Sequence, residues 1–133
     1  SYNNNTTKFN QSMYFYSMKY LVSFFGASAV LLGALGAHTL APYMEASALN
    51  SFKTGILYQL VHSVALFASL KSDVPNWARY SWSIGIVLFS FSIYLLSTDE
   101  LLGLNLNFLG PITPIGGLAF VVGWVGVAFA NRR

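Results

Sequence analysis

Four long apolar stretches occupy most of the 133 residues, and they limit the possible folds more than any other feature. The predicted membrane spans cover residues 20–40, 50–70, 79–98 and 112–130. An α-helix needs about 20 apolar residues to cross a hydrocarbon core about 30 Å thick. A charge at the centre of such a helix costs about 2.5–3.5 kcal/mol on insertion scales, so runs almost free of charge suit a bilayer. The pattern predicts an all-α membrane protein, an antiparallel bundle of four transmembrane helices.

The composition agrees with a membrane location and excludes several classes of protein. Charged residues make up 8% of the chain, against about 25% in soluble domains. Cysteine is absent, which excludes disulfides and thiolate chemistry, and there is no basic stripe with interleaved aromatics of the kind that binds nucleic acid. We expect one transmembrane domain, residues 19–133. A polar N-terminal extension, residues 1–18, precedes it and is interpreted as a disordered tail.

Charges beside the spans predict the orientation of the bundle. With four spans, both termini lie on one side, which carries six basic residues: Lys8, Lys19, Lys71, Arg79, Arg132 and Arg133. The opposite side has one, Lys53. Because Lys and Arg concentrate on the cytoplasmic side of short loops, we expect both termini in the cytoplasm, or in the matrix if the membrane is the mitochondrial inner membrane.

Local signals predict where two of the helices begin. The second helix is expected to start near Glu45, where a carboxylate suits the positive end of the helix dipole. The last helix is expected to start at Thr113, with its hydroxyl as the N-cap and Pro114 at the first helical position.

Seven polar residues inside or beside the spans form the candidate site: His38, Tyr58, Gln59, His62, Ser90, Tyr94 and Thr113. With a rise of about 1.5 Å per residue, they converge on the half of the membrane opposite the termini, with His62 about 20 Å deep. Polar groups at that depth need partners and are functional candidates by default.

Three interpretations of this polar cluster stay open. The first is a structural hydrogen-bond lock between helices. The second is a small-molecule, lipid or proton site in which His62 titrates near neutrality. The third, metal or haem ligation by His38 and His62, is disfavoured because their estimated depths differ by more than about 10 Å. No acidic residue lies within a span, so a carboxylate relay or a triad acid beside His62 is missing and we predict no catalytic residue. We also predict no cofactor and no metal site.

Small residues at helical spacing predict how the helices pack. One set lies on the first span (Gly26, Ala29, Gly33 and Ala37) and one on the fourth (Gly116, Ala119, Gly123 and Gly126). Helices in lipid associate by close backbone approach, which faces of small residues allow. Two such sets predict a tight bundle, and one of them could also be the docking face for a partner protein.

Several short motifs occur in order along the chain. They are the run Gly33–His38 with Leu40, Tyr58-Gln59 with His62, Ser90 and Ser92 with Tyr94, and Thr113–Gly117 followed by Gly123-Trp124. From about residue 20 to the C-terminus, the chain resembles the transmembrane protein 256 / YgdD-like family, a domain of unknown function. Phe91 departs from the family pattern, which tends to have glycine there. The resemblance implies a four-span bundle without assigned enzymatic activity, found in bacterial inner membranes and, in animals, in mitochondrial or other intracellular membranes.

These observations predict a non-catalytic integral membrane protein. The preferred function is a structural or accessory subunit that docks onto a larger membrane complex, preferably a respiratory assembly of the mitochondrial inner membrane. The alternative is a protein that binds or passes a small molecule, lipid or proton through the polar cluster. The expected partners are the lipid bilayer and other membrane-protein subunits, and a bacterial-type inner membrane is the alternative location.

Overall fold

The described part of the chain is built from helices and short connections. The computed structural model describes residues 2–130, and within that range no strand occurs. The long elements are α1 (Tyr2–Leu35), α2 (Ala46–Ser69) and α5 (Ile112–Val127). Between α2 and α5, α3 (Asn76–Gly85), a π-helical stretch η3 (Ile86–Phe91) and α4 (Ser92–Thr98) form one continuous rod. The prediction of an all-α chain is confirmed.

Within the described residues, three of the four helical rods are long and apolar enough to cross a membrane. They are Thr6–Tyr43, Asn76–Thr98 and Asn107–Val127. Helix α2 has 24 residues, about 36 Å at the usual rise, so its length suffices. Its most apolar stretch falls short of the mean hydropathy that the other three reach, and its crossing of the membrane stays a prediction.

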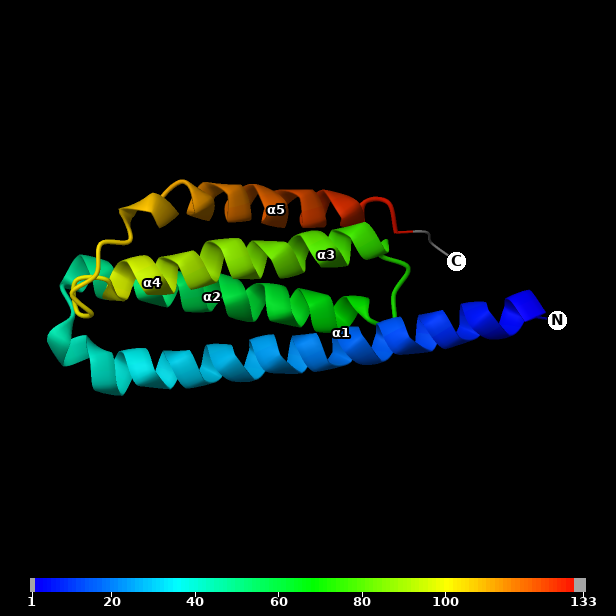
Figure 1. Cartoon of the computed structure of the whole chain (residues 1–133), viewed down its shortest axis with the longest axis horizontal. Helices are drawn as coiled ribbons and strands as arrows, with labels where there is room; N and C mark the ends of the chain where they lie inside the picture. Colours follow the sequence, from blue (N-terminus) through cyan, green and yellow to red (C-terminus); the bar gives the residue numbers. More distant parts are fainter. Residues whose placement is uncertain (1, 131–133) are drawn as a thin grey trace.

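The rods lie roughly antiparallel, with α2 and the α3–α4 rod in the middle and α1 and α5 on opposite sides of them (Figure 1). Helix α1 begins and α5 ends at the same end of the molecule (Figure 1), here called the terminal end. The larger core cluster joins all four rods: Val22, Phe25, Leu66, Trp82, Ile86 and Phe120. A smaller one, Phe52, Ile56 and Tyr94, lies towards the other end.

The N-terminal extension is helical, and its interpretation as a disordered tail was wrong. Helix α1 begins at Tyr2 and continues into the first span without a break, so its first turns project beyond the other helices (Figure 1). Extending an existing helix avoids the cost of nucleation, which makes isolated polar segments of this length unstable. Tertiary contacts add to this, because Met18 is buried and the ring of Tyr14 meets that of Tyr80 edge-on at 5.9 Å.

One of the two predicted helix starts is right and the other is wrong. Glu45 is the N-cap residue of α2, as predicted. Helix α5 begins earlier than expected, at Ile112, with Pro111 in the N-cap position. Pro114 still lies in the first turn, where a missing amide hydrogen is tolerated because those amides have no acceptor within the helix. The hydroxyl of Thr113 bonds to the Ser92 Oγ at 2.7 Å instead of capping the helix.

The small residues of α5 lie where its backbone comes closest to the α3–α4 rod. A Cβ on Gly116 would overlap the backbone of Phe89, and one on Gly123 would overlap the indole of Trp82. Gly126 approaches the Cβ of Ala78 in the same way, while Ala119 is half-buried. This face is therefore filled by α3 and η3 and is not free for a partner.

The small residues of α1 do not share one contact. Ala29 is fully buried, and a Cβ on Gly33 would lie 3.7 Å from the Cγ2 of Ile56. Gly26 faces open space, with nothing within 4 Å of a built Cβ, and Ala37 is exposed. The last turns, Gly36–Leu40, are π-helical, and the small residue buried there is Gly36 instead of the predicted Ala37.

Candidate functional site

Gln59 is the centre of a buried hydrogen-bond network that joins three helices. Its side chain on α2 is 0% exposed. The amide nitrogen donates to the Phe25 carbonyl and to the Ser28 hydroxyl on α1, both at 2.8 Å. The hydroxyl of Tyr94 on α4 donates to the amide oxygen at 2.7 Å. Both amide hydrogens and the amide oxygen are therefore used inside the protein.

Two serine hydroxyls make further bonds between helices. Ser90, in the π-helical stretch, donates to the Gly55 carbonyl on α2 at 2.8 Å. A Cβ on Gly55 would lie 2.8 Å from the ring of Tyr94, so the absence of a side chain at Gly55 allows this ring to pack close to the α2 backbone. Together with the Ser92–Thr113 bond, these contacts connect α2, the α3–α4 rod and α5.

His62 is held in one tautomer by its neighbours. Its side chain is 3% exposed, and its Nε2 lies 3.0 Å from the Trp124 Nε1. An indole N–H can only donate, so Nε2 accepts and carries no proton. The proton is therefore on Nδ1, which donates to the Tyr58 carbonyl at 2.7 Å. The neutral ring also stacks on Phe120, with centroids 3.6 Å apart, and neither nitrogen is left for a metal or a proton relay.

The structure buries four of the seven predicted cluster residues, Gln59, His62, Ser90 and Tyr94, while Thr113 is half-buried and Tyr58 is exposed. Tyr58 contributes its carbonyl to His62 and packs its ring on Phe89 at 4.7 Å. His38 lies apart, exposed on the π-helical turn near the end of the bundle. Within residues 2–130, no three His, Cys, Asp or Glu side chains are grouped as a metal site would need. The bonds described here are those of a lock between helices.

A second polar region centres on Arg79, which the sequence analysis used only as a topological charge. Arg79 is 7% exposed. Its Nη2 donates to the carbonyls of Ser69 at 2.6 Å and Ser72 at 2.8 Å. Its Nη1 donates to the Asn76 amide oxygen at 2.7 Å, and its Nε to the Ser69 hydroxyl at 3.3 Å. All of these acceptors are neutral, although a buried cation is most strongly stabilised by a negative partner.

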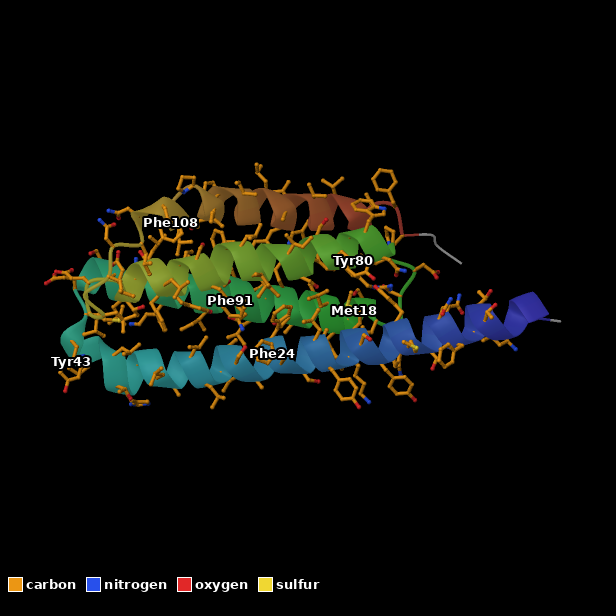
Figure 2. The ribbon with its side chains drawn as sticks, in the orientation of Figure 1. Met18, Phe24, Tyr43, Tyr80, Phe91 and Phe108 are labelled. Atoms are coloured by element: carbon orange, nitrogen blue, oxygen red, sulfur yellow. The ribbon has the colours of Figure 1, made fainter. Side chains whose placement is uncertain are left out.

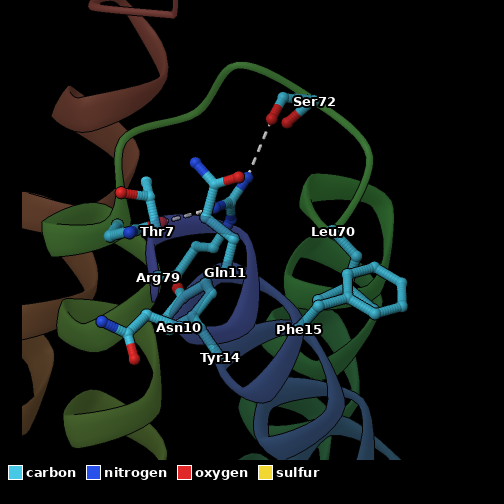
Figure 3. Close-up of a pocket in the computed structure, with 9 residues that line it drawn as sticks. Thr7, Asn10, Gln11, Tyr14, Phe15, Leu70, Ser72 and Arg79 are labelled. Atoms are coloured by element: carbon cyan, nitrogen blue, oxygen red, sulfur yellow. Dashed lines mark hydrogen bonds between the residues drawn. The ribbon is translucent and has the colours of Figure 1, made fainter. Parts of the chain in front are cut away.

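Arg79 lies at the base of a hollow of about 510 Å³ at the terminal end, between α1 and the connection from α2 to α3 (Figure 3). The residues that line the hollow are Thr7, Asn10, Gln11, Tyr14, Phe15, Leu70, Ser72, Asn76 and Arg79. Sequence reasoning missed this region because half of it comes from the extension expected to be disordered. The sequence feature that could have indicated this region is an arginine at the start of a span, close to the serine-rich end of the preceding helix.

Long apolar helices that bury polar side chains such as Gln59, His62 and Ser90 between them define an integral membrane protein. Comparison with known families shows which one. The family described as "Protein of unknown function (DUF423)" matches residues 32–117, and the chain belongs to it.

The relatives agree with this assignment. A UPF0382 membrane protein of Haemophilus influenzae is 40% identical over 118 residues, covering 85% of this chain and 91% of the relative. The UPF0382 membrane protein YwdK of Bacillus subtilis is 37% identical, with 77% and 85% covered. The UPF0382 inner membrane protein YgdD of Escherichia coli is 34% identical, with 71% and 73% covered. No solved structure matches the chain. The family resemblance predicted from the motifs is confirmed.

Proposed function

We propose that this protein is a non-catalytic four-span bundle that docks onto a larger membrane assembly as an accessory subunit. The observation that carries the proposal is an exposed stripe on α1, here called the outer stripe: Phe9, Met13, Tyr16, Tyr20 and Phe24. These residues are three or four positions apart, so they lie on one face of the helix. Phe9 is 64% exposed and Tyr20 is 72% exposed.

The first part of the outer stripe favours a protein partner over lipid. Phe9 and Met13 lie in the polar extension, before the apolar segment that begins near residue 20. Lipid tails would cover Phe24 but not these two side chains, which would face water. Adjacent large apolar side chains outside the membrane mark interaction surfaces, and an amphipathic helix commonly lies in an apolar groove of its partner. The partner expected is a membrane subunit with such a groove beside its membrane surface.

The burial of the polar side chains of α2 supports the proposal that α2 is the fourth span. Gln59 and His62, which lower the hydropathy of α2, are 0% and 3% exposed. Lipid would therefore meet mainly the outer face of α2, with Leu57, Val61, Val64 and Phe67. Four spans would place both termini on the side with most Lys and Arg, which is the cytoplasmic side.

The relatives favour a bacterial-type inner membrane as the location, because the proteins named above are bacterial. The mitochondrial inner membrane and its respiratory assemblies stay a prediction. The rival function, binding or permeation through the polar cluster, is less favoured, because hydrogen bonds inside the bundle use Gln59, His62 and Tyr94.

The test is the size of the native particle. Membranes containing the full chain are extracted with a gentle detergent, and the particle is compared with the variant Phe9→Ala/Met13→Ala. We expect the wild type in a large complex with other proteins and the double variant mostly released. Phe108→Ala is the matched control, since Phe108 is 69% exposed at the other end of the bundle (Figure 2). Migration of the wild type only as a free 14.6 kDa chain would contradict docking.

A further inference from the structure

Two hollows lie along the seam between α1 and α3, here called the α1–α3 seam. The polar one contains Tyr14 and Arg79 at the terminal end. The other, about 330 Å³, is apolar and is lined by Leu21, Phe25, Ser83, Ile84, Val87 and Leu88. Both helices run away from the terminal end (Figure 1). Tyr14 and Leu21 are seven residues apart, so they share a face, and Leu21 lies about 10 Å further along.

The polar hollow holds two hydrogen-bond donors that the described residues leave without acceptors. A guanidinium has five N–H groups, and four of those of Arg79 are used in the bonds to Ser69, Ser72 and Asn76. One N–H on Nη1 remains. The hydroxyl of Tyr14 lies beside the guanidinium, is buried, and has no hydrogen-bond partner of ordinary geometry among the described residues. A buried donor without an acceptor is costly.

These donors fit a phosphate oxygen. An anionic oxygen accepts from guanidinium and hydroxyl groups in short, strong bonds, and it would also supply the negative charge that the neutral acceptors of Arg79 do not. Two exposed lysines, Lys8 and Lys71, lie near the hollow in sequence, with the acidic Asp73 on the same connection. The balance of charge favours an anion.

The apolar hollow indicates that the phosphate group belongs to a lipid. Its one polar member, Ser83, donates its hydroxyl to the Arg79 carbonyl at 2.9 Å, so it turns away from a ligand. The order of the two hollows, polar at the end and apolar towards the membrane interior, is that of a phospholipid. We propose that the α1–α3 seam binds one phospholipid of net negative charge, with the phosphodiester on Arg79 and Tyr14 and an acyl chain beside Leu21 and Val87.

This site goes beyond the docking function, and its test uses no residue of the outer stripe. The full chain is purified in detergent and titrated with phosphatidylglycerol or with phosphatidylcholine of the same acyl chains, and bound lipid is counted by native mass spectrometry. We expect phosphatidylglycerol to bind about tenfold more tightly, the ratio produced by 1.4 kcal/mol. Equal affinity for the two lipids would overturn the proposal.

Two variants separate the headgroup from the chain. Tyr14→Phe removes only the hydroxyl and should weaken phosphatidylglycerol binding about three- to tenfold, as expected for the net contribution of one ordinary hydrogen bond. Val87→Trp should fill the apolar hollow and weaken lipid binding while leaving the helical circular dichroism signal unchanged. Tyr43→Phe is the control for the first variant, since Tyr43 is exposed, does not line the hollow and is not part of the outer stripe.

Inorganic phosphate distinguishes a lipid from a soluble anion. If millimolar phosphate displaces phosphatidylglycerol completely and Val87→Trp binds the lipid normally, the hollow is a soluble anion site and the lipid proposal is wrong. Unchanged affinity in Tyr14→Phe would also overturn it, because the phosphodiester would then lie elsewhere. Retention of lipid against phosphate, with loss in both variants, is the expected result.

Discussion

The network around Gln59 makes a quantitative prediction about stability. Tyr94→Phe removes the hydroxyl that donates to the Gln59 amide oxygen at 2.7 Å and leaves that buried oxygen without this donor. Hydrogen bonds between helices in membrane proteins are worth about 0.6 kcal/mol on average and at most about 1.7, and an unsatisfied buried group costs about 1–3 kcal/mol. We expect Tyr94→Phe to lower the free energy of unfolding by about 1–2 kcal/mol.

Gln59→Leu should cost more, about 2–4 kcal/mol, because it also removes the bonds to the Phe25 carbonyl and the Ser28 hydroxyl. The double variant Gln59→Leu/Tyr94→Phe leaves neither partner of the shared bond unsatisfied. Its loss should therefore be smaller than the sum of the two single losses, by about 0.6–1.7 kcal/mol.

The assay is reversible unfolding in mixed micelles, with increasing sodium dodecyl sulfate and tryptophan fluorescence as the signal. Tyr58→Phe is the matched control, since it removes the same hydroxyl group from a tyrosine on α2, the helix of Gln59, whose side chain is 40% exposed. It should change the free energy by less than about 0.5 kcal/mol. Strictly additive losses in the double variant would show that Gln59 and Tyr94 are not coupled and do not form a lock between α2 and α4.

Three further predictions concern packing, the histidine and the topology. Gly116→Ala should destabilise the bundle by about 1–3 kcal/mol, because its Cβ would overlap the backbone of a neighbouring helix. Gly26→Ala should be neutral or slightly stabilising, because its Cβ would meet open space. The free energies of unfolding of the two variants test both expectations. Trp124→Phe, which loses the indole bond to the imidazole, should cost about 0.5–1.5 kcal/mol in the same assay. The chain has no cysteine, so single cysteines at Lys53 and Lys71 should react with an impermeant maleimide from opposite sides of intact vesicles; labelling from the same side would refute four spans.

Much of the fold could be predicted from the sequence because the signals are local. An apolar run of about 20 residues has few options in lipid, where each backbone group must be bonded within its own helix. The helical class and the start of α2 at Glu45 follow from such runs and their flanking residues. The family could be recognised from short motifs for the same reason, since each is a few residues long and needs no knowledge of the packing.

The hydrogen-bond partners could not be predicted from the sequence. Depth estimates place Gln59, His62 and Tyr94 near one another, but depth does not give the rotation of a helix about its axis. The bond between His62 and Trp124 joins residues 62 positions apart and depends on how α5 lies against α2. His38 has a suitable chemistry, yet the π-helical turn leaves it exposed.

The sequence by itself determined that this chain is helical, apolar and related to bacterial membrane proteins, because hydrophobicity and backbone bonding act within each segment. Only the tertiary structure decided which polar groups have partners and which do not. Arg79 shows the difference best: alone it is a charge at the edge of a span. In the folded chain it lines the same hollow as Tyr14 of α1, because helix packing brings together residues that the sequence keeps far apart.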